Sequence, residues 1–110
     1  MKPGQLRDHC LSFPGSVETF PFGPDVSVFK VSGKMFALSQ LDAESLRVSV
    51  KCEPDLAEAL RETHDAVIPG YHLNKRHWNT VIIDGSLPDE TIRELIEDSY
   101  DLVVGKLPPG

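Results

Sequence analysis

The sequence predicts an α+β domain of two layers, in which helices cover one face of a single antiparallel sheet. The predicted elements follow the order α-β-β-β-β-α-β-α, and tight turns join consecutive strand-like segments, which is typical of antiparallel neighbours. The 110 residues suffice for one hydrophobic core and are too few for two, so we expect residues 1–110 to form one domain.

The first helix is expected over residues 3–12, because proline is well tolerated in a first helical turn. Leu6, Cys10 and Phe13 follow the i, i+4, i+7 spacing and share one helix face. A Phe-Pro-Gly sequence then ends the helix. A short extended stretch is expected over residues 17–22.

The clearest hairpin joins residues 26–31 to residues 34–39 through a Ser-Gly turn, in which glycine supplies the positive φ. We expect the aromatic face of this hairpin to meet the helices and to include Leu38. The opposite, mixed face would carry Lys30 and Ala37. The register predicted from the two-residue loop gives the cross-strand pairs Phe29–Phe36 and Val28–Ala37.

Apolar and polar residues alternate strictly over residues 46–52, which predicts a half-buried strand with Arg47 and Lys51 on its polar side. A second helix is expected over residues 54–64, because proline and acidic residues favour the first helical turn. Residues 68–70, Ile-Pro-Gly, are expected to interrupt regular structure.

A last strand is expected over residues 78–83, followed by a turn at Asp84 and Gly85. Ser86 and Asp89 have the spacing of a capping box, which marks the start of the final helix. The apolar face of that helix is formed by Ile92, Leu95, Ile96, Tyr100 and Val103.

Composition excludes several classes of protein. The net charge of −6 disfavours non-specific binding to nucleic acid or to an anionic membrane. No apolar run approaches the ~20 residues that cross a bilayer, and no signal-like stretch begins the chain, so we expect a cytoplasmic protein without membrane contact. Of the two cysteines, Cys52 continues the apolar side of its strand and is expected to be buried.

A metal or cofactor site is not expected. His72 and His77 lie five residues apart, which does not place two ligands on one helix face, and no Cys, Asp or Glu nearby completes a ligand set. No Gly-rich phosphate loop, Ser-His-Asp order or pair of catalytic carboxylates is present.

Residues 69–80 form the most unusual segment, because they combine cations, amides, histidines and aromatic rings that suit a phosphate or an unstacked base. Trp78 has a structural alternative, which is to fill the core beneath the final helix. Asn74 and Asn79 have one too, since asparagine commonly satisfies backbone groups in turns. The candidate binding residues here are Tyr71, His72, Asn74, Lys75, Arg76, His77 and Trp78.

A second basic group is predicted on the hairpin and the neighbouring strand. Lys30 falls on the mixed face of the hairpin, and Lys34 lies at its tip. Arg47 and Lys51 occupy the polar side of the next strand. Together with Lys75 and Arg76, these residues make up six of the eleven Lys and Arg residues, so the positive charge is predicted to be segregated from the acidic residues.

Several short motifs follow one another in a characteristic order, at residues 20–23, 28–31, 33–36, 50–54, 69–72 and 74–80, and at Ser99 and Tyr100. Through these motifs the sequence resembles the MmcQ/YjbR family of small bacterial proteins over nearly its whole length. This resemblance implies a compact fold with a single antiparallel sheet, similar to type III secretion chaperones and to frataxin-like (CyaY-like) folds. The family is commonly labelled DNA-binding, and no catalytic residues are carried over from it.

Three functions follow as hypotheses. The first is a non-enzymatic binding protein whose partner is DNA, held by the two basic groups. The second is a chaperone-like adaptor with a protein partner, which the acidic charge and the implied fold favour. The third is a small-anion site or an enzyme, which requires His72, Lys75, Arg76 and His77 to converge around a cavity.

Overall fold

The computed structural model describes residues 1–70 and 73–105, and within these ranges one sheet of six strands is accompanied by three helices. The strand order is β1-β2-β3-β4-β6-β5, and every neighbouring pair is antiparallel. The α+β fold class predicted from the sequence is therefore confirmed. The elements are α1 (Pro3–Leu11), β1 (Ser16–Thr19), β2 (Ser27–Val31), β3 (Lys34–Ser39), β4 (Arg47–Lys51), α2 (Pro54–Thr63), β5 (Val67–Pro69), β6 (Trp78–Ile82) and α3 (Asp89–Gly105).

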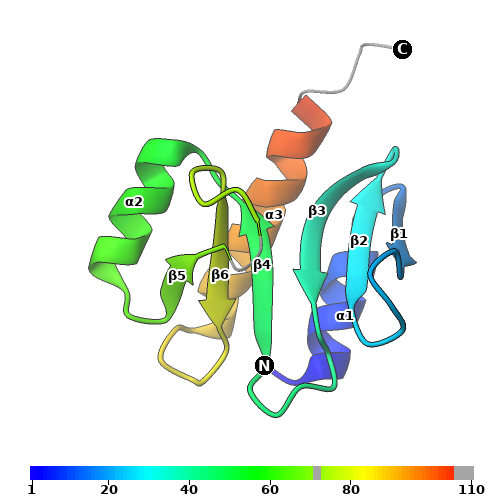
Figure 1. The fold of residues 1–110 in the computed structure, drawn as a ribbon, viewed down its shortest axis with the longest axis horizontal. Helices are drawn as coiled ribbons and strands as arrows, with labels where there is room; N and C mark the ends of the chain where they lie inside the picture. The colour runs from blue at the N-terminus through cyan, green and yellow to red at the C-terminus, as the bar shows by residue number, and fades with distance from the viewer. Residues whose placement is uncertain (71–72, 106–110) are drawn as a thin grey trace.

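The hydrophobic core lies between the sheet and the helices α1 and α3, which cover the same face of the sheet (Figure 1). The predicted inward face of α1 is confirmed by the complete burial of Leu6 and Cys10. The predicted apolar face of α3 is likewise buried, with Ile92 and Ile96 inaccessible. Phe13 follows α1 and stacks on Tyr100 of α3 with ring centroids 4.7 Å apart, which joins the two helices.

The predicted register of the hairpin holds at its tip and is wrong further along, because a β-bulge interrupts the pairing between Phe29 and Lys30. Phe29 lies opposite Ala37 rather than Phe36, so Phe36 is an extra residue in β3. Phe36 and Ala37 both belong to the core, whereas Leu38 moves to the other face of the sheet. The expectation that Leu38 would be internal and Ala37 external is therefore reversed.

Direct pairing between β3 and β4 is short, and Ser99 of α3 bonds to a backbone group of each strand beyond it. The two strands pair directly at Leu38–Ser49 and Ala37–Val50. Beyond them, the Ser99 hydroxyl donates to the Phe36 carbonyl at 2.6 Å and accepts from the Lys51 amide at 2.8 Å. Ser99 is completely buried, so this hydroxyl replaces the missing rungs of the sheet.

Residues 67–69 form an edge strand, which the sequence did not predict. The Ile-Pro-Gly sequence suggested an interruption, but Val67, Ile68 and Pro69 pair with β6. Proline is compatible with this position because β5 is an edge strand, where one side of the backbone needs no partner.

The final helix begins at Asp89, three residues after the predicted cap. Ser86 does not cap it, because both its hydroxyl and its amide donate to the Asp84 carboxylate, at 2.6 Å and 3.0 Å. The first turn is instead anchored by the N-terminal ammonium of Met1, which lies 3.0 Å from the Asp89 carboxylate.

Candidate functional site

The face of the sheet that points away from α1 and α3, called the open face here, gathers cations from two strands (Figure 1). Lys30 of β2 and Arg47 and Lys51 of β4 lie on it, because they alternate along their strands with residues of the core. Glu18 is the only carboxylate in the six strands, and it faces α1, where Arg7 donates to it at 2.9 Å. The open face therefore has cations and no carboxylates among its strand residues.

Lys34 is not part of this group. It begins β3 opposite Val31, whose side chain belongs to the core, so Lys34 lies on the helix side of the hairpin tip and is exposed. The predicted cations of both basic groups are free of ion pairs within the described part of the chain. They are Lys30, Lys34, Arg47, Lys51, Lys75 and Arg76.

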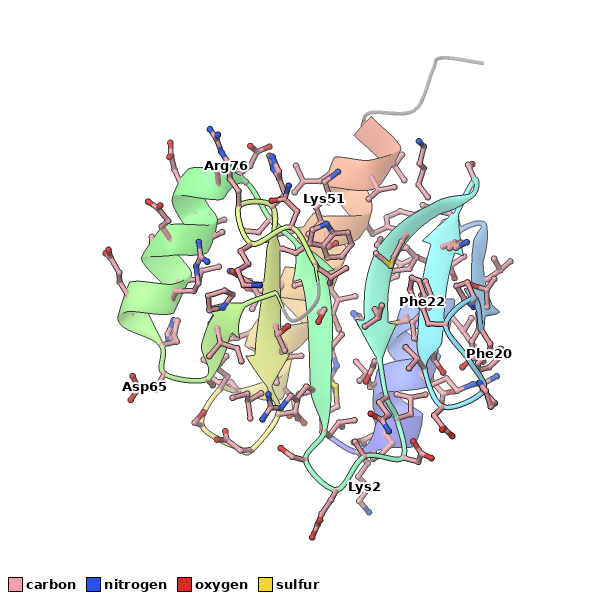
Figure 2. All side chains as sticks on the ribbon, viewed as in Figure 1. Lys2, Phe20, Phe22, Lys51, Asp65 and Arg76 are labelled. Carbon is pink, nitrogen blue, oxygen red and sulfur yellow. The ribbon has the colours of Figure 1, made fainter. Side chains whose placement is uncertain are left out.

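The loop that precedes β6 is organised by Asn74. Its side-chain oxygen accepts from the Arg76 amide at 2.9 Å, and its carbonyl accepts from the Trp78 amide at 2.9 Å. Asn74 therefore has the structural role considered for it, which is to satisfy backbone groups in a turn. Lys75 and Arg76 are exposed, and Figure 2 shows Arg76 at the end of the sheet where Lys51 lies. The predicted residues Tyr71 and His72 lie outside the described residues.

Two contacts hold this loop against the rest of the fold, and the sequence predicted neither. Arg61 of α2 donates to the Lys75 carbonyl at 3.1 Å. The half-buried His77 has its carbonyl oxygen bound by the Cys52 amide at 2.8 Å. Arg61 can be recognised in the sequence as a cation in the last turn of α2. Its partner, the Lys75 carbonyl, lies 14 residues away, and no local sequence pattern predicts a contact over that separation.

Trp78 lies on the open face and not in the core beneath α3. Its cross-strand partner is Lys51, and its neighbour Asn79 faces the helices, where the Asn79 amide nitrogen donates to the Ala57 carbonyl at 3.3 Å. The Trp78 side chain is half-buried. The open face therefore offers an indole ring on the residue that lies opposite Lys51 in the sheet.

A cavity of about 610 Å³ opens on this face above β3 and β4. Its floor contains the hydrogen bond between the Ser49 and Thr80 hydroxyls, 2.8 Å long, and Arg47 lies at its border. Leu38, brought outward by the bulge, lines it together with Phe22. Figure 2 shows Phe22 in front of β2 and β3. Sequence reasoning missed both residues as lining groups.

The two cysteines are buried thiols without a disulfide. Burial, followed by the charge of Glu18, raises the pKa of Cys10 to about 12. Burial, followed by the charge of Asp98, also raises the pKa of Cys52. Both side chains therefore remain protonated at neutral pH, and neither has the properties of a nucleophilic thiolate.

In the parts of the chain that the structure describes, no three His, Cys, Asp or Glu side chains gather in a group suited to a metal ion. Over the same residues, no helix has the length and hydropathy needed to span a bilayer. The features that the open face combines are its cations, the indole ring of Trp78 and the cavity above β3 and β4.

Comparison with known proteins identifies relatives that cover nearly the whole chain. The model of the YjbR family matches residues 11–102. The uncharacterized protein YjbR of Escherichia coli K12 is 39% identical over 108 residues, which cover 98% of this chain and 92% of that protein. The uncharacterized protein YbdF of Escherichia coli O157:H7 is 36% identical over 98 residues, which cover 89% of this chain and 80% of that protein.

Solved structures of similar proteins also match nearly the whole chain. The crystal structure of Deinococcus radiodurans protein DR2400, whose domain is designated DUF419, superposes with a TM-score of 0.90 and 44% identity, covering 96% of this chain and 80% of that one. A crystal structure of a Pseudomonas syringae protein superposes with a TM-score of 0.80 and 30% identity, covering 93% of this chain and 98% of that one.

Proposed function

The chain belongs to the YjbR family, and from this premise we propose that it is a non-enzymatic protein that binds DNA on the open face of its sheet. The observation that carries the proposal is the charge of that face. In a protein of net charge −6, the strand residues of one face include Lys30, Arg47 and Lys51 and no carboxylate. Such a separation creates a local positive potential that attracts a polyanion despite the overall negative charge.

The proposed contacts are made mainly to phosphate groups. Lys30, Arg47 and Lys51 are free of ion pairs within the described residues, so binding a phosphate breaks no internal salt bridge. Lys75 and Arg76 extend the positive region beyond the end of β4. The ring of Trp78, the residue opposite Lys51 in the sheet, is available for stacking on an unpaired base.

Binding through so few cations is expected to be weak and strongly dependent on salt. Each phosphate contact on duplex DNA contributes about −0.9 to the slope of log K against log salt concentration. The three sheet cations alone therefore predict a slope of about −3.

The test is a titration of fluorescently labelled duplex DNA at low and at moderate salt. We expect saturable binding at low salt that weakens as salt rises, and a smaller slope, by about 2, for the double variant Lys30→Gln/Arg47→Gln. The matched control is Lys2→Gln/Arg93→Gln, which removes the same charge from the helix side and should bind as the unmodified protein does. Absence of binding at low salt, or equal losses in the two double variants, would overturn the proposal.

A protein-binding adaptor is the second candidate, and the exposed apolar residues near β1 favour it. Val17 is 52% exposed, Phe20 50% and Phe22 64%, and they lie on or next to an edge strand (Figure 2). Exposed aromatic residues beside an unpaired strand edge are typical of protein interfaces. Capture of a single protein partner, lost in the variant Phe20→Ser/Phe22→Ser and accompanied by no nucleic acid, would favour this function over DNA binding.

A further inference from the structure

A second cavity, of about 490 Å³, lies on the helix-covered side of the sheet between α2 and α3. Figure 1 shows α2 beside β5 at one edge of the sheet and α3 running behind β4 and β6. The volume falls in the range of about 300–1,000 Å³ that is typical of small-molecule sites. Most of the lining is apolar and comes from the sheet and both helices, through Val50, Val81, Leu56, Leu60, Leu95 and Leu102.

The wall of the cavity includes a residue with one buried hydrogen-bond acceptor that is not used within the described part of the chain. Asn79 of β6 lines it and is 1% exposed. Its amide nitrogen donates to the Ala57 carbonyl at 3.3 Å, which determines the orientation of the amide. The other atom of the amide, Oδ1, is buried and has no hydrogen-bond partner among the described residues. Buried polar atoms in native proteins rarely lack a hydrogen-bond partner, so we expect Asn79 Oδ1 to accept a hydrogen bond from a donor outside the described residues.

The charged groups around the cavity are mostly acidic. Glu53 at the start of α2 and Asp98 and Asp101 of α3 line it. Lys51 is the one cation among the described lining residues, and the alternation of β4 places its side chain on the open face. The charge of Asp98 also acts inside the cavity, where it helps to raise the pKa of the lining thiol Cys52, after the larger effect of burial. An anionic ligand would be repelled here, whereas a cation is attracted.

From these observations we propose that the cavity between α2 and α3 binds a small amphipathic organic cation, a protonated amine with an aryl or alkyl body. The apolar body packs against the leucines of the two helices. The ammonium group is attracted by the carboxylates of Asp98 and Asp101, and it donates a hydrogen bond to Asn79 Oδ1 after a small displacement of the cavity wall. This site lies on the other side of the sheet from the open face and does not depend on the proposed binding of DNA.

The proposal is tested by NMR with phenethylamine as the probe and 3-phenylpropionate as its carboxylate counterpart of similar size and shape. We expect phenethylamine to produce saturable chemical-shift changes at the Asn79 side-chain amide and at the methyl groups of Val50, Leu56 and Leu95. A fragment of this size is expected to bind with a millimolar Kd. The carboxylate is expected to bind at least about tenfold more weakly, because it meets carboxylates and cannot donate to Asn79.

The matched variants lie on one helix. Asp98→Asn/Asp101→Asn removes two charges that line the cavity, and we expect about a five- to tenfold increase in the Kd of phenethylamine. Glu94→Gln/Glu97→Gln removes two exposed charges of α3 that do not line it, and the Kd should stay unchanged. Absence of saturable shifts, equal binding of the amine and the carboxylate, or equal effects of the two double variants would overturn the proposal.

Discussion

Ser99 is the residue on which the geometry of the central sheet most depends. Its hydroxyl is bonded both to the Phe36 carbonyl of β3 and to the Lys51 amide of β4, beyond the residues at which the two strands pair directly. It thereby holds the end of β4 that carries Lys51, one of the cations of the open face. A buried side chain of α3 therefore contributes to the proposed interface without facing it.

The substitution Ser99→Ala is expected to lower the free energy of unfolding by about 1–3 kcal/mol, because it leaves a buried amide and a buried carbonyl without a partner. Urea denaturation measures this value. The control is Ser86→Ala, which removes a hydroxyl bonded to Asp84 at an exposed turn and should cost about 0.5 kcal/mol or less. Equal stabilities of the two variants would show that the Ser99 bridge is dispensable.

At the scale of elements, the edge strand β5 is held against β6 by close backbone packing as well as by hydrogen bonds. The Gly70 amide donates to the Trp78 carbonyl at 2.9 Å. A Cβ added at Gly70 would lie 2.8 Å from the Trp78 Cβ and 3.0 Å from the Trp78 carbonyl oxygen. Glycine at this position therefore lets β5 and β6 approach and places Trp78 on the open face.

The substitution Gly70→Ala is expected to lower the free energy of unfolding by about 1–3 kcal/mol, because the strands must separate to accept the methyl group. Gly4→Ala in α1 is the control, since an added Cβ there meets nothing within 4 Å. That variant should be as stable as the unmodified protein or up to about 1 kcal/mol more stable, because alanine favours the helix. Thermal unfolding followed by circular dichroism distinguishes these outcomes.

At the scale of the whole molecule, charge is divided between the two sides of the sheet. The helices carry most of the carboxylates, with three in α2 and six in α3, while the strand residues that lie on the open face include none. The two proposed sites therefore have opposite preferences, for a polyanion on the open face and for an organic cation between the helices. The core between these sides contains Cys10, whose thiol is completely buried.

The stability of the fold is expected to fall at alkaline pH because of Cys10. Burial raises the pKa of this thiol from 9.0 to about 12 in the folded protein, so the folded state favours the protonated form. The corresponding stabilisation is complete below pH 9.0 and is lost as the pH rises towards about 12. Between about pH 8 and about pH 10.5 this amounts to up to about 2 kcal/mol.

Urea denaturation at both pH values measures this effect in the unmodified protein and in Cys10→Ala. The variant is less stable at the lower pH because it leaves a cavity, but its stability should fall less between the two pH values. If the free energy of unfolding fell by the same amount in both proteins between the two pH values, Cys10 would not be the cause of the pH dependence.

Much of the fold was predictable because local patterns report local structure. The periodicity of α1 and α3 and the alternation in β4 each placed an element and its buried side correctly, and the Ser-Gly turn placed the hairpin of β2 and β3. The same alternation placed Arg47 and Lys51 on one face. The loop that contains Lys75 and Arg76 was recognisable from its composition, although its attachment to Arg61 was not.

The sequence by itself determined the fold class, the helix faces and the segregation of charge along the chain. Only the tertiary structure decided the bulge at Phe36, the edge strand β5, the outward position of Trp78 and the cavity between α2 and α3. The physical reason is that each of these depends on groups distant in sequence. Ser99 bonds to a carbonyl 63 residues away, and no local pattern reports such a partner.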